Sequence, residues 1–195
     1  MYKNLYVERN RIIYQSLEDI QNQERGNIVL FCFPTFYKDF GISFYKYYGS
    51  YHWVKNTIVE TKDEELTESN IKLSLLFRKE TGILSETTFK EIENKIKNTP
   101  FPQTQIFGEG GRDGTTYKLT LNSAVSISLS WWDASLEKDS DWQPINNTIS
   151  EITKQVKNFE AEEKKEFLYI YEEDIYKDNL TGDSRVMTHI EFKSI

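Results

Sequence analysis

The chain is predicted to fold as one α+β domain, an antiparallel sheet packed by two or three helices. In several segments apolar and polar residues alternate with a period of two, which is typical of half-buried antiparallel strands. In others the apolar residues recur at steps of three and four, as they do on one face of a helix. The length of 195 residues fits a single domain, for which roughly 100–200 residues are usual.

The first elements are a helix and a buried strand. Residues 5–25 are expected to form the helix, and Gly26 is placed to end it. Its apolar face would consist of Leu5, Ile13, Leu17 and Ile20. The continuously apolar run Ile28 to Phe33 predicts a strand covered on both faces, and Pro34 ends it because proline cannot donate to a ladder.

A hairpin and a further strand are expected next. Residues 42–48 and 51–58 flank Gly49-Ser50, which is a two-residue turn signal. The polar stretch Thr61 to Asn70 is predicted to be an exposed loop. After it, apolar and polar residues alternate from Ile71 to Arg78, which predicts another strand.

Two helices should cover this sheet. Ser85 is a good N-cap for a short helix whose apolar face is Phe89, Ile92 and Ile96, ended by Asn98-Thr99-Pro100. Residues 115–121 and 124–132 alternate strictly and predict a hairpin. The helix after it should lie on this hairpin through Ile145, Ile149, Ile152, Val156 and Phe159.

The C-terminal part predicts two more strands, at 167–171 and 186–192, joined across the turn cluster 179–183. Segments 86–98 and 146–158 share several residues, and each follows strands. One interpretation is an ancient strand-strand-helix duplication, with halves at about 28–98 and 112–159. The other is that two amphipathic helices share a pattern.

The charge points to a protein partner. The formal net charge is −7, from 31 acidic and 24 basic residues. This disfavours nucleic acid, whose binding depends on neutralising phosphates, and favours a partner with a basic surface. The predicted contact residues are Glu160, Glu162, Glu163, Glu172, Glu173 and Asp174. The simpler alternative is a solvated face that keeps the protein soluble.

A cytoplasmic location without a membrane span is expected. The N-terminal residues mix charges throughout, unlike a signal peptide. No stretch reaches the roughly 18 apolar residues of a membrane helix. The single cysteine, Cys32, lies in the apolar run IVLFCF and is predicted to be a buried structural thiol.

Aromatic residues offer an alternative site. The hairpin 42–58 is rich in tyrosine, and because strand residues alternate, one sheet face cannot bury every ring. The leftover face could bind a small ligand or a glycan by stacking. The residues of this alternative are Tyr45, Tyr47, Tyr51 and Trp53.

A third possibility is a hydrolase that uses carboxylates of the loop 133–141, namely Asp133, Asp139 and Asp141. Other catalytic signals are weak. Gly108 to Gly114 precedes a strand and lacks the Lys of a phosphate loop. His52 and His189 stand alone in strand-like segments, so neither a metal site nor a cofactor is predicted.

Residues 112–157 carry a recognisable order of motifs: Asp113-Gly114, an aromatic at Tyr117, a serine-rich strand ending in Trp131-Trp132, and Trp142-x-Pro144 before the helix. This order resembles many small uncharacterised bacterial proteins, some of which resemble immunity proteins of polymorphic toxin systems. The shared motifs are structural and imply no functional residue. The resemblance implies a non-catalytic, immunity-like or antitoxin-like protein that masks another protein.

Overall fold

A computed structural model describes residues 5–22, 26–34, 38–67, 69–101, 115–122, 126–133, 142–177 and 184–195. These residues form one eight-stranded antiparallel sheet with three helices, which confirms the predicted α+β class. The helices are α1 (Leu5–Asn22), α2 (Glu86–Asn98) and α3 (Gln143–Val156). The strands are β1 (Ile28–Pro34), β2 (Phe40–Tyr47), β3 (Ser50–Leu66), β4 (Asn70–Leu84), β5 (Thr115–Asn122), β6 (Ser126–Asp133), β7 (Glu163–Lys177) and β8 (Ser184–Ser194).

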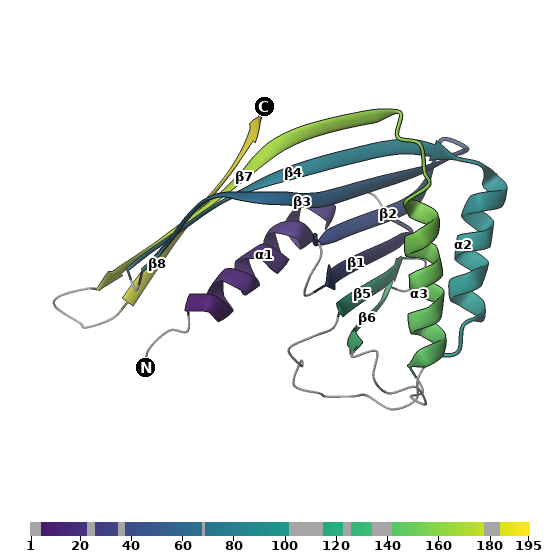
Figure 1. Ribbon diagram of the computed structural model, residues 1–195, viewed down its shortest axis with the longest axis horizontal. Coiled ribbons are helices and arrows are strands. Elements are labelled where there is room, and N and C mark those ends of the chain that lie inside the picture. Colours follow the sequence, from purple (N-terminus) through teal and green to yellow (C-terminus); the bar gives the residue numbers. More distant parts are fainter. Residues whose placement is uncertain are drawn as a thin grey trace.

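Helices cover both faces of the sheet, whose strand order is β6-β5-β1-β2-β3-β4-β7-β8. α1 packs against β1, β2 and β3 on one side, which we call the α1 face. α2 and α3 lie side by side on the opposite side, the α3 face (Figure 1). The long strands β3, β4, β7 and β8 continue past α2 and α3 as a curved ribbon (Figure 1).

β1 is the strand that both layers share. Alternation sends Ile28, Leu30 and Cys32 to the α3 face, where they join the larger core cluster. Val29, Phe31 and Phe33 point to the α1 face and pack with Leu17 and its neighbours on α1. Because the side chains on both faces are buried, the prediction of a doubly covered strand is confirmed. The strand ends at Pro34, as predicted.

The hairpin between β2 and β3 turns one residue earlier than predicted. Tyr47 pairs with Ser50, so Tyr48 and Gly49 form the turn rather than Gly49 and Ser50. Both turn residues have positive φ, 46° for Tyr48 and 86° for Gly49. A type I′ turn requires positive φ at both central positions, and its twist matches the flanking strands.

The predicted exposed loop at Thr61 to Asn70 is wrong. β3 continues to Leu66 and pairs with β4 down to Leu66↔Ile71, so most of this stretch is strand. Its side chains from Glu60 to Glu65 are exposed on both faces of the strand. Arg9 of α1 bonds Glu64 through Nε at 2.8 Å. A polar sequence therefore forms a strand here through its partner, without an apolar stripe of its own.

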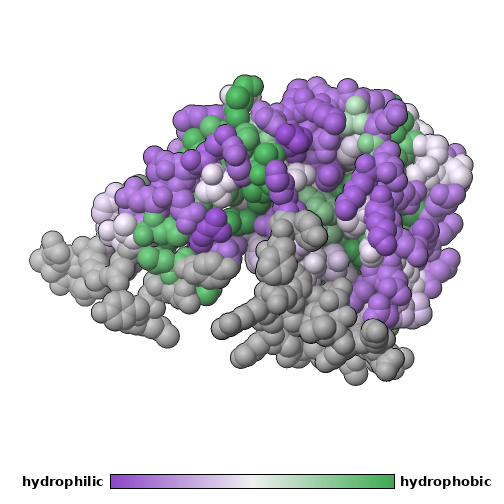
Figure 2. Space-filling model, in the orientation of Figure 1, coloured by the Kyte–Doolittle hydropathy of each residue, from purple (hydrophilic) through white to green (hydrophobic). Residues whose placement is uncertain are grey.

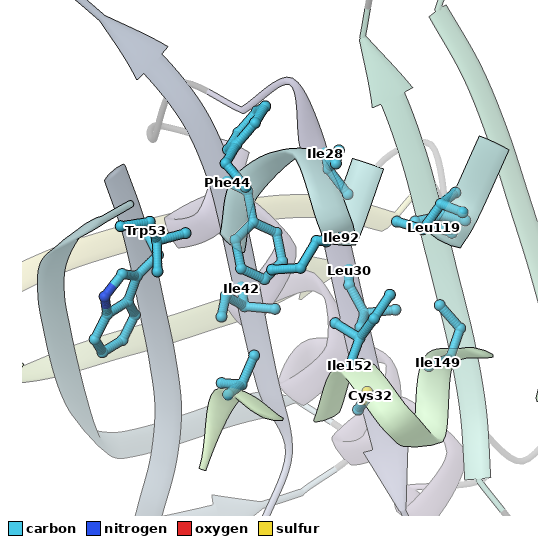
Figure 3. Packing of buried hydrophobic residues seen from close by; sticks show 14 of the residues in the cluster. Ile28, Leu30, Cys32, Ile42, Phe44, Trp53, Ile92, Leu119, Ile149 and Ile152 are labelled. Atoms are coloured by element: carbon cyan, nitrogen blue, oxygen red, sulfur yellow. The ribbon is translucent and has the colours of Figure 1, made fainter. Parts of the chain in front are cut away.

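α2 and α3 form the expected layer. Ser85 caps α2 by accepting from the backbone N–H of Thr88 at 3.0 Å, as predicted. Ile145, Ile149, Ile152 and Val156 of α3 are all buried, as predicted. Phe159, the last residue of the predicted helical stripe, lies beyond the end of α3 and is partly buried against the same cluster. Figure 3 shows Ile149 and Ile152 directed at the sheet near Leu30, Cys32 and Leu119. The stripe thus contacts β1 as well as the β5–β6 hairpin.

The two helices also contact each other. Lys95 Nζ lies 3.0 Å from Glu151 Oε2, and the hydroxyls of Thr99 and Thr148 are 2.7 Å apart. Each helix follows an antiparallel strand pair, β3–β4 or β5–β6, and packs on the same face. The strand-strand-helix duplication stays a hypothesis.

The final strands fall where they were predicted but are longer, since β7 and β8 pair from Phe167↔Ser194 to Lys177↔Ser184.

Candidate functional site

The six predicted acidic contact residues do not form one surface. Glu163 and Asp174 stand eleven residues apart on β7, which corresponds to about 36 Å along an extended strand. Alternation also sends Glu172 and Asp174 to one face and Glu173 to the other. The sequence places these residues close together along the chain, but the strand spreads them over its length and both sides.

Glu173 is buried on the α1 face, with 5% of its surface exposed, and is unavailable to a partner. The Tyr171 hydroxyl donates to its carboxylate at 2.5 Å, and Arg11 Nη2 of α1 lies 3.7 Å away. Burial, with the neighbouring Glu173 carboxylate, raises the pKa of Tyr171. Glu173 therefore helps to fasten α1 to β7, which corrects its predicted role as a contact residue.

The other acidic residues lie at two separate places. Glu172 pairs with Lys72 at 3.1 Å, and Asp174 accepts from the Asn70 amide at 2.5 Å, near the far end of the ribbon. Glu160, Glu162 and Glu163 are exposed at the corner between α3 and β7. We call these last three the acidic corner.

The aromatic alternative is also divided between the faces. Tyr51 and Trp53 are buried in the cluster beneath α2 and α3, where Tyr51 packs on Phe89 with ring centroids 4.8 Å apart. Tyr45 and Tyr47 point to the α1 face, and Tyr45 stacks on His52 at 5.3 Å. The four rings thus offer no common platform, because neighbouring positions on β2 and β3 alternate between faces.

Trp53 explains a glycine on the neighbouring strand. Trp53 pairs with Gly82 of β4, and a Cβ at Gly82 would lie 2.7 Å from the indole nitrogen. The ring can cross the strand only because that position has no side chain. Trp53 is therefore a core residue rather than a binding residue.

The hydrolase alternative cannot be placed. Asp139, Asp141 and the side chain of Asp133 lie outside the described residues, as does Gly108 to Gly114. In the part of the chain that the structure describes, no three His, Cys, Asp or Glu side chains gather as metal ligands do. His189 lies on β8 opposite Glu172, far from His52.

None of the described helices is long and apolar enough to cross a membrane.

Cys32 is a buried thiol, as predicted. Burial raises its pKa to about 12, and a contact with the Thr153 hydroxyl offsets only part of this effect. The thiol therefore stays protonated near neutral pH. A protonated thiol is a poor nucleophile, so its surroundings do not favour covalent catalysis.

The outer strand β8 exposes a row of apolar side chains on the α1 face. Val186, Ile190 and Phe192 share this face, with the polar Thr188 between the first two, and 55%, 42% and 46% of their surfaces are exposed. We call these three residues the β8 row. The expected strand at 186–192 contains the row, but a sequence does not reveal which strand will lie at the edge of a sheet.

One end of the β8 row borders a hollow. Phe192 contacts Phe167 and Tyr169 of β7, with ring centroids 6.4 Å and 5.5 Å apart. Beside them is a hollow of about 610 Å³ lined by Phe167, Phe192 and Ile195 together with several lysines. Figure 2 shows an apolar band that begins at the C-terminal end of the chain, between hydrophilic regions.

The charges around this hollow are largely compensated. Lys164 pairs with Glu80 at 3.2 Å, and Lys165 pairs with Glu163 at 2.7 Å. Lys193 pairs with Glu191 of the same strand at 3.0 Å. Apolar contact and backbone hydrogen bonding, rather than net charge, are therefore what the β8 edge offers to another molecule.

Comparison of the chain with protein-family models, with curated protein sequences and with solved structures finds no match.

Proposed function

We propose that this chain is a non-catalytic protein-binding protein that takes up an extended segment of a partner along β8. The observation that carries the proposal is the β8 row, which lies on the last strand of the sheet and is about half exposed. Exposed apolar side chains that gather on one face of a folded protein are typical of interaction sites. The chain would do this as a single cytoplasmic domain.

Strand addition is the binding mode that fits an edge. Among the strands that the structure describes, β8 has one neighbour, β7, so its outer side has backbone N–H and C=O groups without ladder partners there. Its eleven residues span about 36 Å. In strand addition the main chain supplies affinity, and pockets for alternate side chains supply specificity. The hollow beside Phe167 and Phe192 is such a pocket.

The sharpest form of the proposal is an immunity-like or antitoxin-like role, in which the bound partner is a toxin domain that is masked. It is supported by the resemblance of residues 112–157 and by the net charge of −7. The exposed acidic corner would then attract a basic partner and speed its association, while β8 holds it. In this form of the proposal, the acidic corner attracts the partner and a different part of the molecule, β8, makes the contact that holds it.

The test compares one substitution on each sheet edge. Ile190→Lys places a charge in the β8 row. Ile127→Lys is the matched control, because Ile127 is 52% exposed on the opposite edge strand β6. A partner captured from the host is identified, and its binding to the parent and both variants is measured by surface plasmon resonance. For the immunity-like form, the neighbouring gene product is co-expressed and cell survival is scored.

Ile190→Lys is expected to weaken partner binding by tenfold or more, roughly the effect of losing one interface anchor. Ile127→Lys should leave binding unchanged. Equal affinity of the parent and Ile190→Lys would contradict binding at β8. Self-association that Ile190→Lys abolishes would identify the occupant as a second copy of this chain.

A further inference from the structure

A cavity of about 480 Å³ lies between the C-terminal end of α3 and the sheet. It is separate from the β8 edge. α3 ends at Val156, and the strand ends near Pro34, Phe40 and Thr115 continue past it. The volume falls in the range of small-molecule sites, roughly 300–1,000 Å³.

The floor of the cavity is one row of side chains across four neighbouring strands. In the register of the sheet, Tyr117 of β5 pairs with Cys32 of β1, Cys32 pairs with Phe40 of β2, and Phe40 pairs with Thr57 of β3. All four side chains line the cavity. Three strand spacings make the row about 14 Å long. The floor is therefore elongated and runs from an aromatic ring to a hydroxyl.

The β5 and β1 end of this floor is apolar. Cys32 is buried there with Val156 of α3 above it, and Figure 3 shows its sulfur below Ile152. The raised pKa of the thiol, about 12, reflects the same low polarity. This end suits the hydrocarbon part of a ligand.

The β3 end is polar and lacks hydrogen-bond partners. Among the described residues, the Thr57 hydroxyl is buried without a partner. The Thr153 hydroxyl of α3 is also buried, but it lies beside the Cys32 thiol, over β1. Buried hydroxyls are normally hydrogen-bonded, and those without partners call for an explanation. A ligand oxygen at this end would supply the missing bond.

Lysines surround the polar end. Lys55 lies two residues before Thr57 on the same face of β3, with its Nζ 5.4 Å from the centre of the Phe40 ring and 3.5 Å from a Glu80 oxygen. Lys38 and Lys157 are exposed at the mouth and, within the described part of the chain, form no ion pair. Three lysines around one mouth stand out in a protein of net charge −7.

Two acids oppose these lysines. Glu80 offsets Lys55, and it is shared with Lys164. Asp39 follows Lys38 in the chain; burial raises its pKa to about 7, and the charge that lowers it is that of Arg9 on α1 rather than a lysine of the mouth. The mouth therefore keeps a positive excess.

We propose that this cavity binds a small amphipathic carboxylate. The hydrocarbon part lies over Cys32 and Tyr117, and the carboxylate lies near Thr57 and Lys55, with Lys38 and Lys157 closing the mouth. The β3 end favours this orientation, because there the carboxylate can accept a charge-assisted hydrogen bond from the Thr57 hydroxyl and lie near Lys55. The site is independent of the partner-binding role proposed for β8.

The test is calorimetric titration of the full chain with octanoate. 1-Octanol has the same chain without the charge and is the ligand control. Lys157→Met removes one mouth cation. Lys154→Met is its matched control, since Lys154 is also exposed on the last turn of α3 but does not line the cavity. Thr57→Val removes the buried hydroxyl at nearly constant volume.

Octanoate is expected to bind one equivalent and 1-octanol to bind about tenfold more weakly or worse. Lys157→Met should weaken octanoate roughly threefold or more, and Lys154→Met should leave it unchanged. Thr57→Val should weaken octanoate without lowering the melting temperature of the free protein. Absent binding, equal binding of 1-octanol, or equal losses in Lys154→Met and Lys157→Met would each overturn the proposal.

Discussion

The two edge strands of the sheet, β6 and β8, have similar alternating sequences and different surroundings. On β6, Leu129 and Trp131 point to the α3 face and pack beneath the helices, so that Trp131 is only 6% exposed. On β8, the row Val186, Ile190 and Phe192 points to the α1 face and stays about half exposed. The same period-two pattern therefore gives an edge that is covered at Leu129 and Trp131, although not at Ile127, and an open edge at β8.

The difference arises from where the helices lie. α3 crosses the β5 and β6 side of the sheet, and its Asn146 accepts from the Trp131 indole N–H at 2.7 Å. α1 packs on β1, β2 and β3, near the middle of the sheet, and leaves β8 open. An alternating strand shows which side chains share a face, but only the neighbouring layer decides whether that face is buried.

The largest expected effect is on the covered edge. Trp131→Ala should lower the free energy of unfolding by about 3–5 kcal/mol, because a large buried ring is lost and a cavity remains. Phe192→Ala, its counterpart on β8, should cost about 1 kcal/mol or less, because half of that ring already contacts solvent. Urea denaturation measures both. Equal losses would show that β8 is covered as well as β6.

A smaller effect is expected at the contact between α3 and β6. Asn146→Leu removes the acceptor of the Trp131 indole and leaves a buried N–H unpaired, at a cost of about 1–3 kcal/mol. Asn147→Leu is the control, because Asn147 is exposed and accepts from its helix neighbour Gln143 at 2.9 Å. The same denaturation experiment compares them. A loss in Asn147→Leu as large as that in Asn146→Leu would mean that α3 is not held by this bond.

The smallest effect on stability is expected at the acidic corner, on the α3 end of β7. Reversing Glu160, Glu162 and Glu163 to lysine should change the free energy of unfolding by less than about 0.5 kcal/mol, because these charges are exposed. It should slow association with a basic partner and flatten its salt dependence. Binding kinetics at two salt concentrations test this. Association as fast as that of the parent would leave β8 as the sole contact.

The sequence predicted elements best where periodicity and burial agree. The run Ile28 to Phe33, the α2 stripe with its Ser85 cap and the α3 stripe were all located correctly. The prediction from the sequence pattern was wrong at Thr61 to Asn70, where a polar stretch forms a strand through pairing with β4. It also misplaced the turn at Tyr48-Gly49, because a tyrosine with positive φ gives no signal in the sequence.

Candidate sites were harder to predict than elements. Glu173 looked like its acidic neighbours, yet a strand position facing α1 buried it beside Tyr171 and Arg11. Tyr51 and Trp53 looked available for stacking until α2 covered them. The β8 row and the cavity beneath α3 were missed, because each depends on segments distant in the sequence. No local pattern reports such contacts.

The sequence by itself determined the helices and strands that carry an apolar pattern and which of their side chains share a face, because both follow from short-range geometry of the backbone. The tertiary structure alone decided the strand order. Ile28 pairs with Leu121, and Phe77 pairs with Phe167, across long stretches of chain. Strand pairing places β8 at an open edge and brings Tyr117, Cys32, Phe40 and Thr57 into one row beneath the end of α3. Both proposed binding sites arise from that placement, since exposure depends on packing between distant elements rather than on local pattern.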